Sequence, residues 1–159
     1  DQVDGMSQQL DEAGSRLQQA GLRLAYHNHA MEFHRMAGST VLERIFARSR
    51  PGHLGAELDI HWVQAGGGDP VVWCRRLAGR LPILHVKDFT VSAKGEREFA
   101  EVGAGNLDIS AILKAAAQSG CEWFVVEQDT CQRDPFECVA QSLAYLTSLE
   151  KPTPPCQDP

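Results

Sequence analysis

The feature that most constrains the fold of this chain is a short apolar run that ends in an acidic or histidine side chain, and that occurs four times. Leu54 to Asp59 and Leu81 to His85 are two such runs, separated by an amphipathic stretch. On either side, Leu22 to Tyr26 leads into the sequence H-N-H-A-M-E, and Trp123 to Val126 leads into Glu127. Short apolar runs are typical of buried strands, so we expect four strands whose polar ends meet at one site.

Helical patterns alternate with these strands, because apolar residues recur three or four positions apart between them. Helices are expected over residues 6–20, 40–48, 69–79, 108–120 and from 134 onward. The pairs Asp69–Pro70 and Asp134–Pro135 indicate helix starts, with the aspartate as N-cap and the proline at the first helical position. In the last helix the expected buried residues are Phe136, Val139, Leu143 and Leu146, and Trp123 is expected in the core.

The resulting order is one helix followed by four strand-helix units, which favours a parallel α/β fold with right-handed crossovers. An eight-stranded TIM barrel takes about 250 residues, so 159 residues supply roughly half of one. The chain begins with an extra helix and lacks an initiator methionine, and we therefore expect the C-terminal half of a (β/α)8 barrel. The domain is predicted over residues 1–150, with a disordered proline-rich tail over residues 151–159.

Composition narrows the class of protein further. The formal net charge of −6 is a poor match for a phosphate backbone, which disfavours binding to nucleic acid. No apolar run approaches the roughly 20 residues that cross a membrane, and the N-terminus does not resemble a signal peptide, so we expect a cytoplasmic protein. The five cysteines form no C-x-x-C pair and are expected to be reduced thiols.

The four candidate ligands are spaced as successive strand ends. Glu32, Asp59 and His85 are separated by 27 (59 minus 32) and 26 (85 minus 59) residues, and Glu127 follows His85 after 42 (127 minus 85). A βαβ unit occupies about 30 residues, so one ligand per strand is expected. The longer last interval holds a polar loop between Asp88 and Leu107, which is a candidate lid. Three carboxylates and one imidazole suit Mn²⁺, Mg²⁺ or Co²⁺, with Zn²⁺ as an alternative.

Five segments of the sequence resemble, in order, the motifs of sugar phosphate isomerases/epimerases of the xylose isomerase-like barrel superfamily. They lie between about Gly21 and Tyr145 and read Y-H-N-H-A-M-E-F, L-D-I-H-W-V-Q-A-G-G-G-D-P, H-V-K-D-F, E-V-G-A-G-N-L-D and W-F-V-V-E-Q-D. The resemblance implies one divalent metal ion, held by Glu32, Asp59, His85 and Glu127.

The same resemblance implies a reaction. Glu32 and Glu127 would be an acid/base pair that moves a proton through an enediolate of a ketose or related hydroxycarbonyl sugar, with the metal polarising the substrate oxygens. His29 and His61 are candidate partners of sugar hydroxyls, and Trp62 could pack on a sugar face. Lys87 is expected on the same side of its strand as His85, where it would bind substrate or, alternatively, form a salt bridge with an acidic neighbour. His27, in contrast, is expected to point away from His29 and to be a buried core residue.

Several alternatives stay open at this point. Epimerisation and isomerisation differ only in where the proton returns, and an inosose dehydratase-like lyase of the same superfamily would lose water instead. An apurinic endonuclease-like nuclease would need several zinc ions and more histidines, and the acidic charge argues against it. The substrate is expected to be a small sugar or sugar phosphate, with no membrane partner. A half-barrel also exposes two sheet edges, so the chain could be inactive alone, form a homo-oligomer, or need the missing N-terminal half-barrel.

Overall fold

Four strands form one parallel sheet in the order β1-β4-β5-β8, and they are β1 (Leu24–His27), β4 (Leu54–Asp59), β5 (Ile83–Val86) and β8 (Trp123–Val126). The structure is a computed structural model that describes residues 2–149. The four strands pair in the order in which they occur along the chain, and the register places Asp59 opposite His85. The predicted α/β fold with four parallel strands is therefore confirmed, and it corresponds to part of a barrel.

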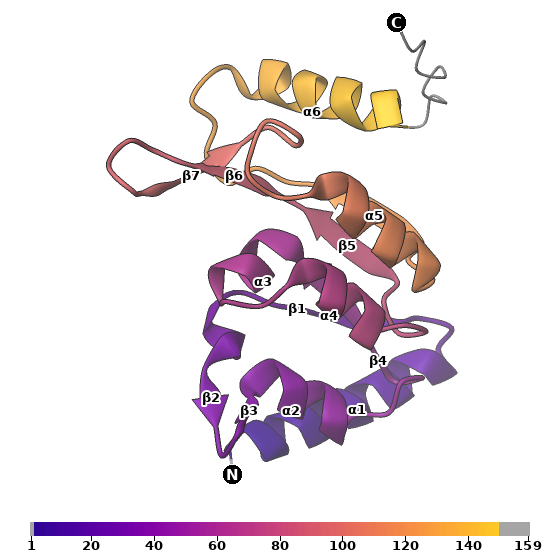
Figure 1. The fold of residues 1–159 in the computed structure, drawn as a ribbon. Coiled ribbons are helices and arrows are strands. Elements are labelled where there is room, and N and C mark those ends of the chain that lie inside the picture. The colour runs from indigo at the N-terminus through magenta and orange to yellow at the C-terminus, as the bar shows by residue number, and fades with distance from the viewer. Residues whose placement is uncertain (1, 150–159) are drawn as a thin grey trace, which may run out of the picture.

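Five longer helices alternate with the strands: α1 (Gln2–Gln19), α2 (Val41–Arg48), α4 (Pro70–Arg76), α5 (Ile109–Gln118) and α6 (Pro135–Leu149). Their starts follow from the sequence. Thr40 forms a capping box with Glu43, and the side chains of Asp69 and Asp108 each accept a hydrogen bond from the backbone N–H three residues on. In Figure 1 these helices follow one another beside the sheet, and α6 lies at the end farthest from α1.

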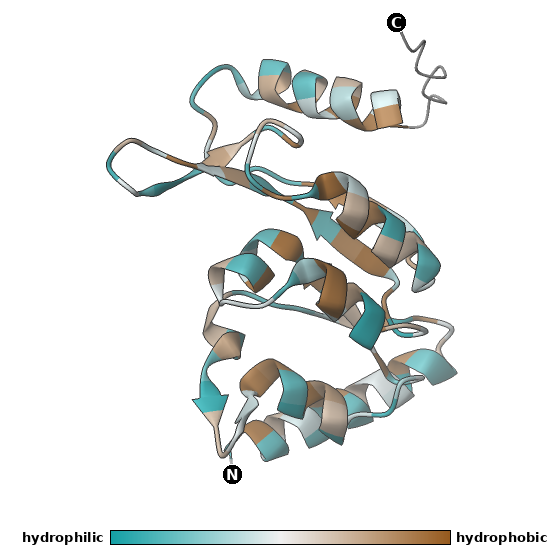
Figure 2. Ribbon diagram, viewed as in Figure 1, coloured by the Kyte–Doolittle hydropathy of each residue, from teal (hydrophilic) through white to brown (hydrophobic). Residues whose placement is uncertain are grey.

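The core lies between the sheet and the helices. Leu54, Leu58 and Leu84 are 0–1% exposed, and they belong to one cluster with buried residues of α2 and α5. Figure 2 shows apolar colouring along much of β5 and alternating apolar and polar colouring on the helices beside it. The alternate side chains of the strands face the opposite side of the sheet, where they are free to form a polar site.

The structure also contains elements that the sequence patterns did not predict. The glycine-rich segment after β4 begins with a short helix, α3 (Ile60–Ala65), and the segment after β1 contains the 3₁₀ helix η1 (Met31–Phe33) and the short strands β2 (Arg35–Met36) and β3 (Ser39–Thr40). The predicted long polar loop is corrected to a hairpin of β6 (Asp88–Val91) and β7 (Arg97–Ala100), followed by a shorter loop. Figure 1 shows this hairpin extending beyond the sheet.

The last strand and helix correct a second prediction. Trp123 is 63% exposed, and Phe136, Val139 and Leu143 of α6 are 86%, 52% and 62% exposed, although all four were expected in the core. The reason is topological, since β8 is an edge of the sheet and no described strand lies beyond it. The α6 helix buries Cys138 instead.

Other expectations concern segments and chemistry outside the sheet. The predicted tail over residues 151–159 lies outside the described residues. Cys74, Cys121, Cys131 and Cys138, the cysteines within residues 2–149, are free thiols. Among the helices described, none is both long and apolar enough to cross a membrane.

Candidate functional site

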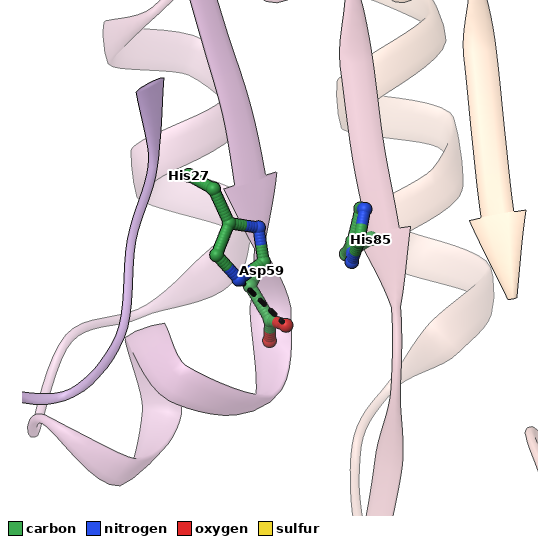
Figure 3. A group of neighbouring side chains, drawn as sticks. All are labelled: His27, Asp59 and His85. Carbon is green, nitrogen blue, oxygen red and sulfur yellow. Dashed lines mark ion pairs between the residues drawn. The ribbon is translucent and has the colours of Figure 1, made fainter. Parts of the chain in front are cut away.

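Three side chains from three neighbouring strands converge at the carboxyl end of the sheet. His27 ends β1, Asp59 ends β4 and His85 lies near the end of β5, and one ligand atom from each lies within 4.8 Å of the other two. Figure 3 shows the three side chains on separate strands, with the ion pair between His27 and Asp59 drawn as a dashed line. We refer to them as the ligand group. It contains Asp59 and His85 from the set suggested by the sequence, together with His27.

His27 is the member that the sequence interpretation placed elsewhere, as a core residue pointing away from His29. Its ring instead lies 4.7 Å from the ring of His85 and 4.9 Å from that of His29, measured between centroids. Its Nε2 atom lies 3.9 Å from Asp59 Oδ2, and its Nδ1 atom is buried without a hydrogen-bond partner among the described residues. Burial, and next the charge of His85, lower the pKa of His27, which favours the neutral imidazole that binds metal ions.

Asp59 is fixed by a backbone hydrogen bond at one carboxylate oxygen and faces the Lys87 ammonium with the other. It is fully buried, and its Oδ1 accepts the Trp62 backbone N–H at 3.0 Å, capping α3. The Asn28 side chain bonds both backbone groups of Asp59, at 3.0 and 3.3 Å. Its Oδ2 has no hydrogen bond of good geometry within the described chain, although Lys87 Nζ lies 3.2 Å away. A buried carboxylate oxygen of this kind is suited to bind a cation.

His85 lies between two carboxylates. Its Nδ1 is 2.6 Å from Glu127 Oε2, and its Nε2 is 2.5 Å from Glu57 Oε1. Glu57 was not anticipated, but the signal was present, because it precedes Asp59 by two positions and so faces the same side of β4. Burial opposes ionisation of Glu127, yet hydrogen bonds with Lys87 and His85 outweigh it and lower its pKa. One carboxylate can orient the imidazole, and the other would have to release its ring nitrogen before His85 could bind a metal ion.

Lys87 is a buried cation surrounded by acids. Its side chain is 3% exposed, and Nζ lies 3.0 Å from both Glu127 Oε2 and Asp129 Oδ1, in addition to its contact with Asp59. Burial alone would lower the pKa of Lys87, but the hydrogen bond with Asp129 and the other carboxylates raise it. The ammonium group therefore balances part of the negative charge around the ligand group.

Glu32 lies apart from the ligand group in this arrangement. It belongs to η1 and is 8% exposed, and its carboxylate accepts hydrogen bonds from the Tyr26 hydroxyl at 3.0 Å and from the His29 backbone N–H at 2.8 Å. Both oxygens are thus engaged by the loop that follows β1. A metal role for Glu32 requires that these bonds be exchanged for a bond to the ion.

Aromatic side chains extend from the ligand group along α3. The ring of His29 lies 5.5 Å from that of Trp62, and the ring of His61 lies 4.7 Å from Trp62 and is stacked on Phe99 of β7 at 4.7 Å. His61 is 3% exposed, and burial lowers its pKa despite the nearby charge of Asp59. The residues expected to contact substrate therefore form one wall beside the ligand group.

The donor atoms present fit a divalent cation. Two imidazoles and one buried carboxylate, with Glu57 and Glu127 at hydrogen-bond distance from His85, form a nitrogen- and oxygen-rich set. Such a set accepts Mn²⁺, Co²⁺ or Zn²⁺, and with its two imidazoles it is richer in nitrogen than the set expected from the sequence. His27 Nδ1, which has no hydrogen-bond partner within the described residues, and Asp59 Oδ2, which faces the Lys87 ammonium, are the buried atoms that a bound ion would contact.

Known proteins share this fold. Residues 1–149 match the family described as xylose isomerase-like TIM barrel. A sugar phosphate isomerase/epimerase from Parabacteroides distasonis is similar with a TM-score of 0.79 and 27% identity, covering 92% of this chain and 52% of that one. Two further structures share the fold at 14% identity. The E. coli 3-keto-D-glucoside 4-epimerase has a TM-score of 0.62, with 89% of this chain and 52% of that one covered. The probable 3-DHS dehydratase of petrobactin synthesis from Bacillus anthracis has a TM-score of 0.68, with 91% of this chain and 56% of that one covered.

Comparison with the curated proteins gave no match. The chain spans about half the length of the solved structures that it resembles. Its order of elements, its four parallel strands and its match over residues 1–149 agree with one another. The chain belongs to the xylose isomerase-like TIM barrel family, whose members include sugar isomerase- and epimerase-like enzymes.

Proposed function

We propose that this chain carries the metal-binding part of a divalent-metal-dependent sugar or sugar phosphate isomerase or epimerase. The observation that supports the proposal best is the ligand group itself, in which three strands bring His27, Asp59 and His85 within 4.8 Å of one another. Membership of the family adds the substrate class, since one similar structure is a sugar phosphate isomerase/epimerase. Asp59, His85 and His27 would hold the ion, and Glu127 and Glu32 could complete its coordination.

Glu127 and Glu32 are the proposed proton-transfer pair. Glu127 follows β8 and Glu32 follows β1, which are the two outer strands of the sheet, so the two carboxylates lie on opposite flanks of the ligand group. This arrangement suits removal of a proton from one side of a sugar and its return from the other. A bound divalent ion would supply Lewis-acid stabilisation of the enediolate at adjacent substrate oxygens.

The remaining residues orient and balance this site. His85 is held by Glu57 and Glu127, and Lys87 neutralises the carboxylates that face it. His29, His61 and Trp62 offer ring nitrogens and aromatic faces to a sugar. The reaction of the longer relatives is proposed for this chain because its own residues can fill these roles.

The experiment that tests the proposal measures bound metal and molecular size together. Protein would be reconstituted with Mn²⁺, passed over a calibrated column and analysed for metal, as wild type, as His85→Ala and as His34→Ala. His34 is an exposed histidine outside the ligand group and serves as the matched control. We expect about one ion per chain in wild type and His34→Ala and a loss of that ion in His85→Ala. Wild-type protein that elutes as a defined species without metal would refute the proposal.

Metal-loaded protein would then be incubated with ketoses in D₂O. Deuterium at the carbon next to the carbonyl, lost in Glu127→Gln, would support proton transfer. The product separates the remaining alternatives, because an epimer or an isomer keeps the mass of the substrate apart from deuterium, whereas a lyase product is lighter by one water. Absence of exchange in metal-loaded protein with every ketose would favour an inactive half-barrel.

A further inference from the structure

Beside the ligand group lies a second pocket, which we call the hairpin pocket. It has a volume of about 360 Å³ and is lined by His61, Trp62, Glu96, Arg97 and Phe99. Its two walls are α3 and the β6–β7 hairpin, and the latter is a segment that extends past the end of the sheet in Figure 1. Small-molecule sites in proteins usually start at about 300 Å³, so the pocket can hold a ring-sized group.

A continuous series of rings joins the hairpin pocket to the ligand group. The centroid distances are 4.7 Å from His85 to His27, 4.9 Å from His27 to His29, and 5.5 Å from His29 to Trp62. Trp62 therefore contributes to both places. A substrate that reaches from the ligand group along this wall would put its far end against the hairpin.

The chemistry of the hairpin pocket matches a neutral ring that carries several hydroxyls. The edges and faces of Trp62 and Phe99, with centroids 6.3 Å apart, offer apolar surface to the C–H face of a sugar. Arg97 can only donate hydrogen bonds and Glu96 can only accept them when ionised, whereas a hydroxyl does both. Within the described residues, the Arg97 side chain makes no ion pair or hydrogen bond, and only its backbone pairs with Val91 across the hairpin, so the guanidinium donors are available.

Two buried ring nitrogens of this wall also have no partner. His61 Nδ1 and Trp62 Nε1 are inaccessible to solvent and make no hydrogen bond within residues 2–149. Buried polar atoms are usually satisfied, so each one without a partner calls for an explanation such as a functional role or a bound water or ion. A hydroxyl-bearing ligand that entered between the rings would provide those bonds.

We propose that the hairpin pocket binds the second, non-reacting sugar ring of a glycoside whose reacting ring lies at the ligand group. The inference rests on the proposed function and narrows its substrate class from free sugars and sugar phosphates to glycosides. Glu96 in the lining disfavours a multiply charged phosphate at this position.

The test follows the indole N–H signal of Trp62 in ¹H–¹⁵N spectra, where the chain has only three tryptophans. The signals of Trp62, Trp73 and Trp123 would be assigned by single Trp→Phe variants. The probes are glucose, glucose 6-phosphate, and the disaccharides maltose, cellobiose, sucrose and trehalose. We expect at least one disaccharide to shift the Trp62 signal at a half-saturating concentration about tenfold lower than glucose or glucose 6-phosphate. The exposed Trp123 signal should not move.

Two variants and one matched control locate the effect. Arg97→Ala and Phe99→Ala should raise the half-saturating concentration of that disaccharide to the value for glucose, and Lys94→Ala, on the same hairpin outside the pocket, should leave it unchanged. Because Arg97 is exposed, its variant should fold even where Phe99→Ala does not. Equal affinity for disaccharides and glucose would overturn the inference, as would tightest binding of glucose 6-phosphate that depends on Arg97.

The indole signal needs neither metal nor turnover, which separates the two proposals. If the protein prefers a disaccharide but neither binds metal nor exchanges protons with ketoses, the hairpin pocket is supported and only the proposed function is refuted. Metal binding and exchange on free ketoses without any disaccharide preference would overturn the hairpin pocket alone.

Discussion

Asp88 organises the loop that connects the hairpin to α5, and its replacement should be strongly destabilising. The side chain is 1% exposed and accepts four backbone N–H bonds. Oδ1 accepts from Phe89 at 2.8 Å and Leu107 at 3.2 Å, and Oδ2 accepts from Gly103 at 3.0 Å and Gly105 at 3.1 Å. A Cβ atom at Gly105 would overlap this carboxylate, so the chain passes close around it.

The magnitude follows from those four bonds. A hydrogen bond to a charged group contributes roughly 1.5 kcal/mol or more, so four would give at least about 6 kcal/mol if all were lost without compensation. The N–H group of Gly103 belongs to an exposed residue and those of Gly105 and Leu107 to partly buried ones, so part of this bonding can be regained from water, whereas Phe89 is buried. Retaining about half of the sum, we expect Asp88→Ala to lower the free energy of unfolding by about 3 kcal/mol, a large part of the stability of a small domain.

Urea unfolding followed by circular dichroism would measure the change, with Asp108→Ala as control. Asp108 is an exposed N-cap that accepts one backbone N–H, from Ala111 at 3.0 Å, and its loss should cost about 1 kcal/mol. Asp88→Asn keeps only one acceptor oxygen and should fall between wild type and Asp88→Ala. Equal effects of Asp88→Ala and Asp108→Ala would refute the reasoning, since the fourfold bonding of Asp88 would then add nothing.

Three further outcomes are expected from single changes. Thr40→Ala removes the side-chain acceptor of the Glu43 N–H, and it should lower the free energy of unfolding by about 1 kcal/mol in the same urea assay. Hydrogen bonds from the Cys138 thiol and the Arg133 guanidinium lower the pKa of Glu101 to about 2. The stabilisation that the ionised Glu101 provides is therefore complete above about pH 4.5 and is lost as the pH falls toward 2. Glu101→Gln should flatten the plot of unfolding free energy against pH over that window. Lys87→Met leaves three carboxylates without their cation, and it should destabilise the metal-free protein by about 3 kcal/mol. The same change should enlarge the rise in melting temperature on adding Mn²⁺, and calorimetry would measure both effects.

The sheet could be predicted because its information is local and periodic. Each strand is a short apolar run, each is followed by an amphipathic helix, and the interval from Asp59 to His85 is one strand-helix step, so their adjacency in the register follows from the sequence. The hairpin lacked such a signal. Its outer part, from Val91 to Glu98, carries charged residues because it extends beyond the sheet and is largely exposed, and the segment was therefore taken for a polar loop.

The composition of the site could be predicted only as far as strand periodicity reaches. Asp59 and His85 end regular strands, and the same periodicity would have identified Glu57, two positions before Asp59 on the same face. His27 and Glu32 lie where β1 ends, and there the side-chain direction depends on contacts between strands: the ring of His27 is placed by His85, and Glu32 is held by Tyr26 and the His29 backbone. A metal role for Glu32 therefore requires the loop after β1 to rearrange, whereas His27 is already in place, so His27→Ala should weaken metal binding more than Glu32→Ala.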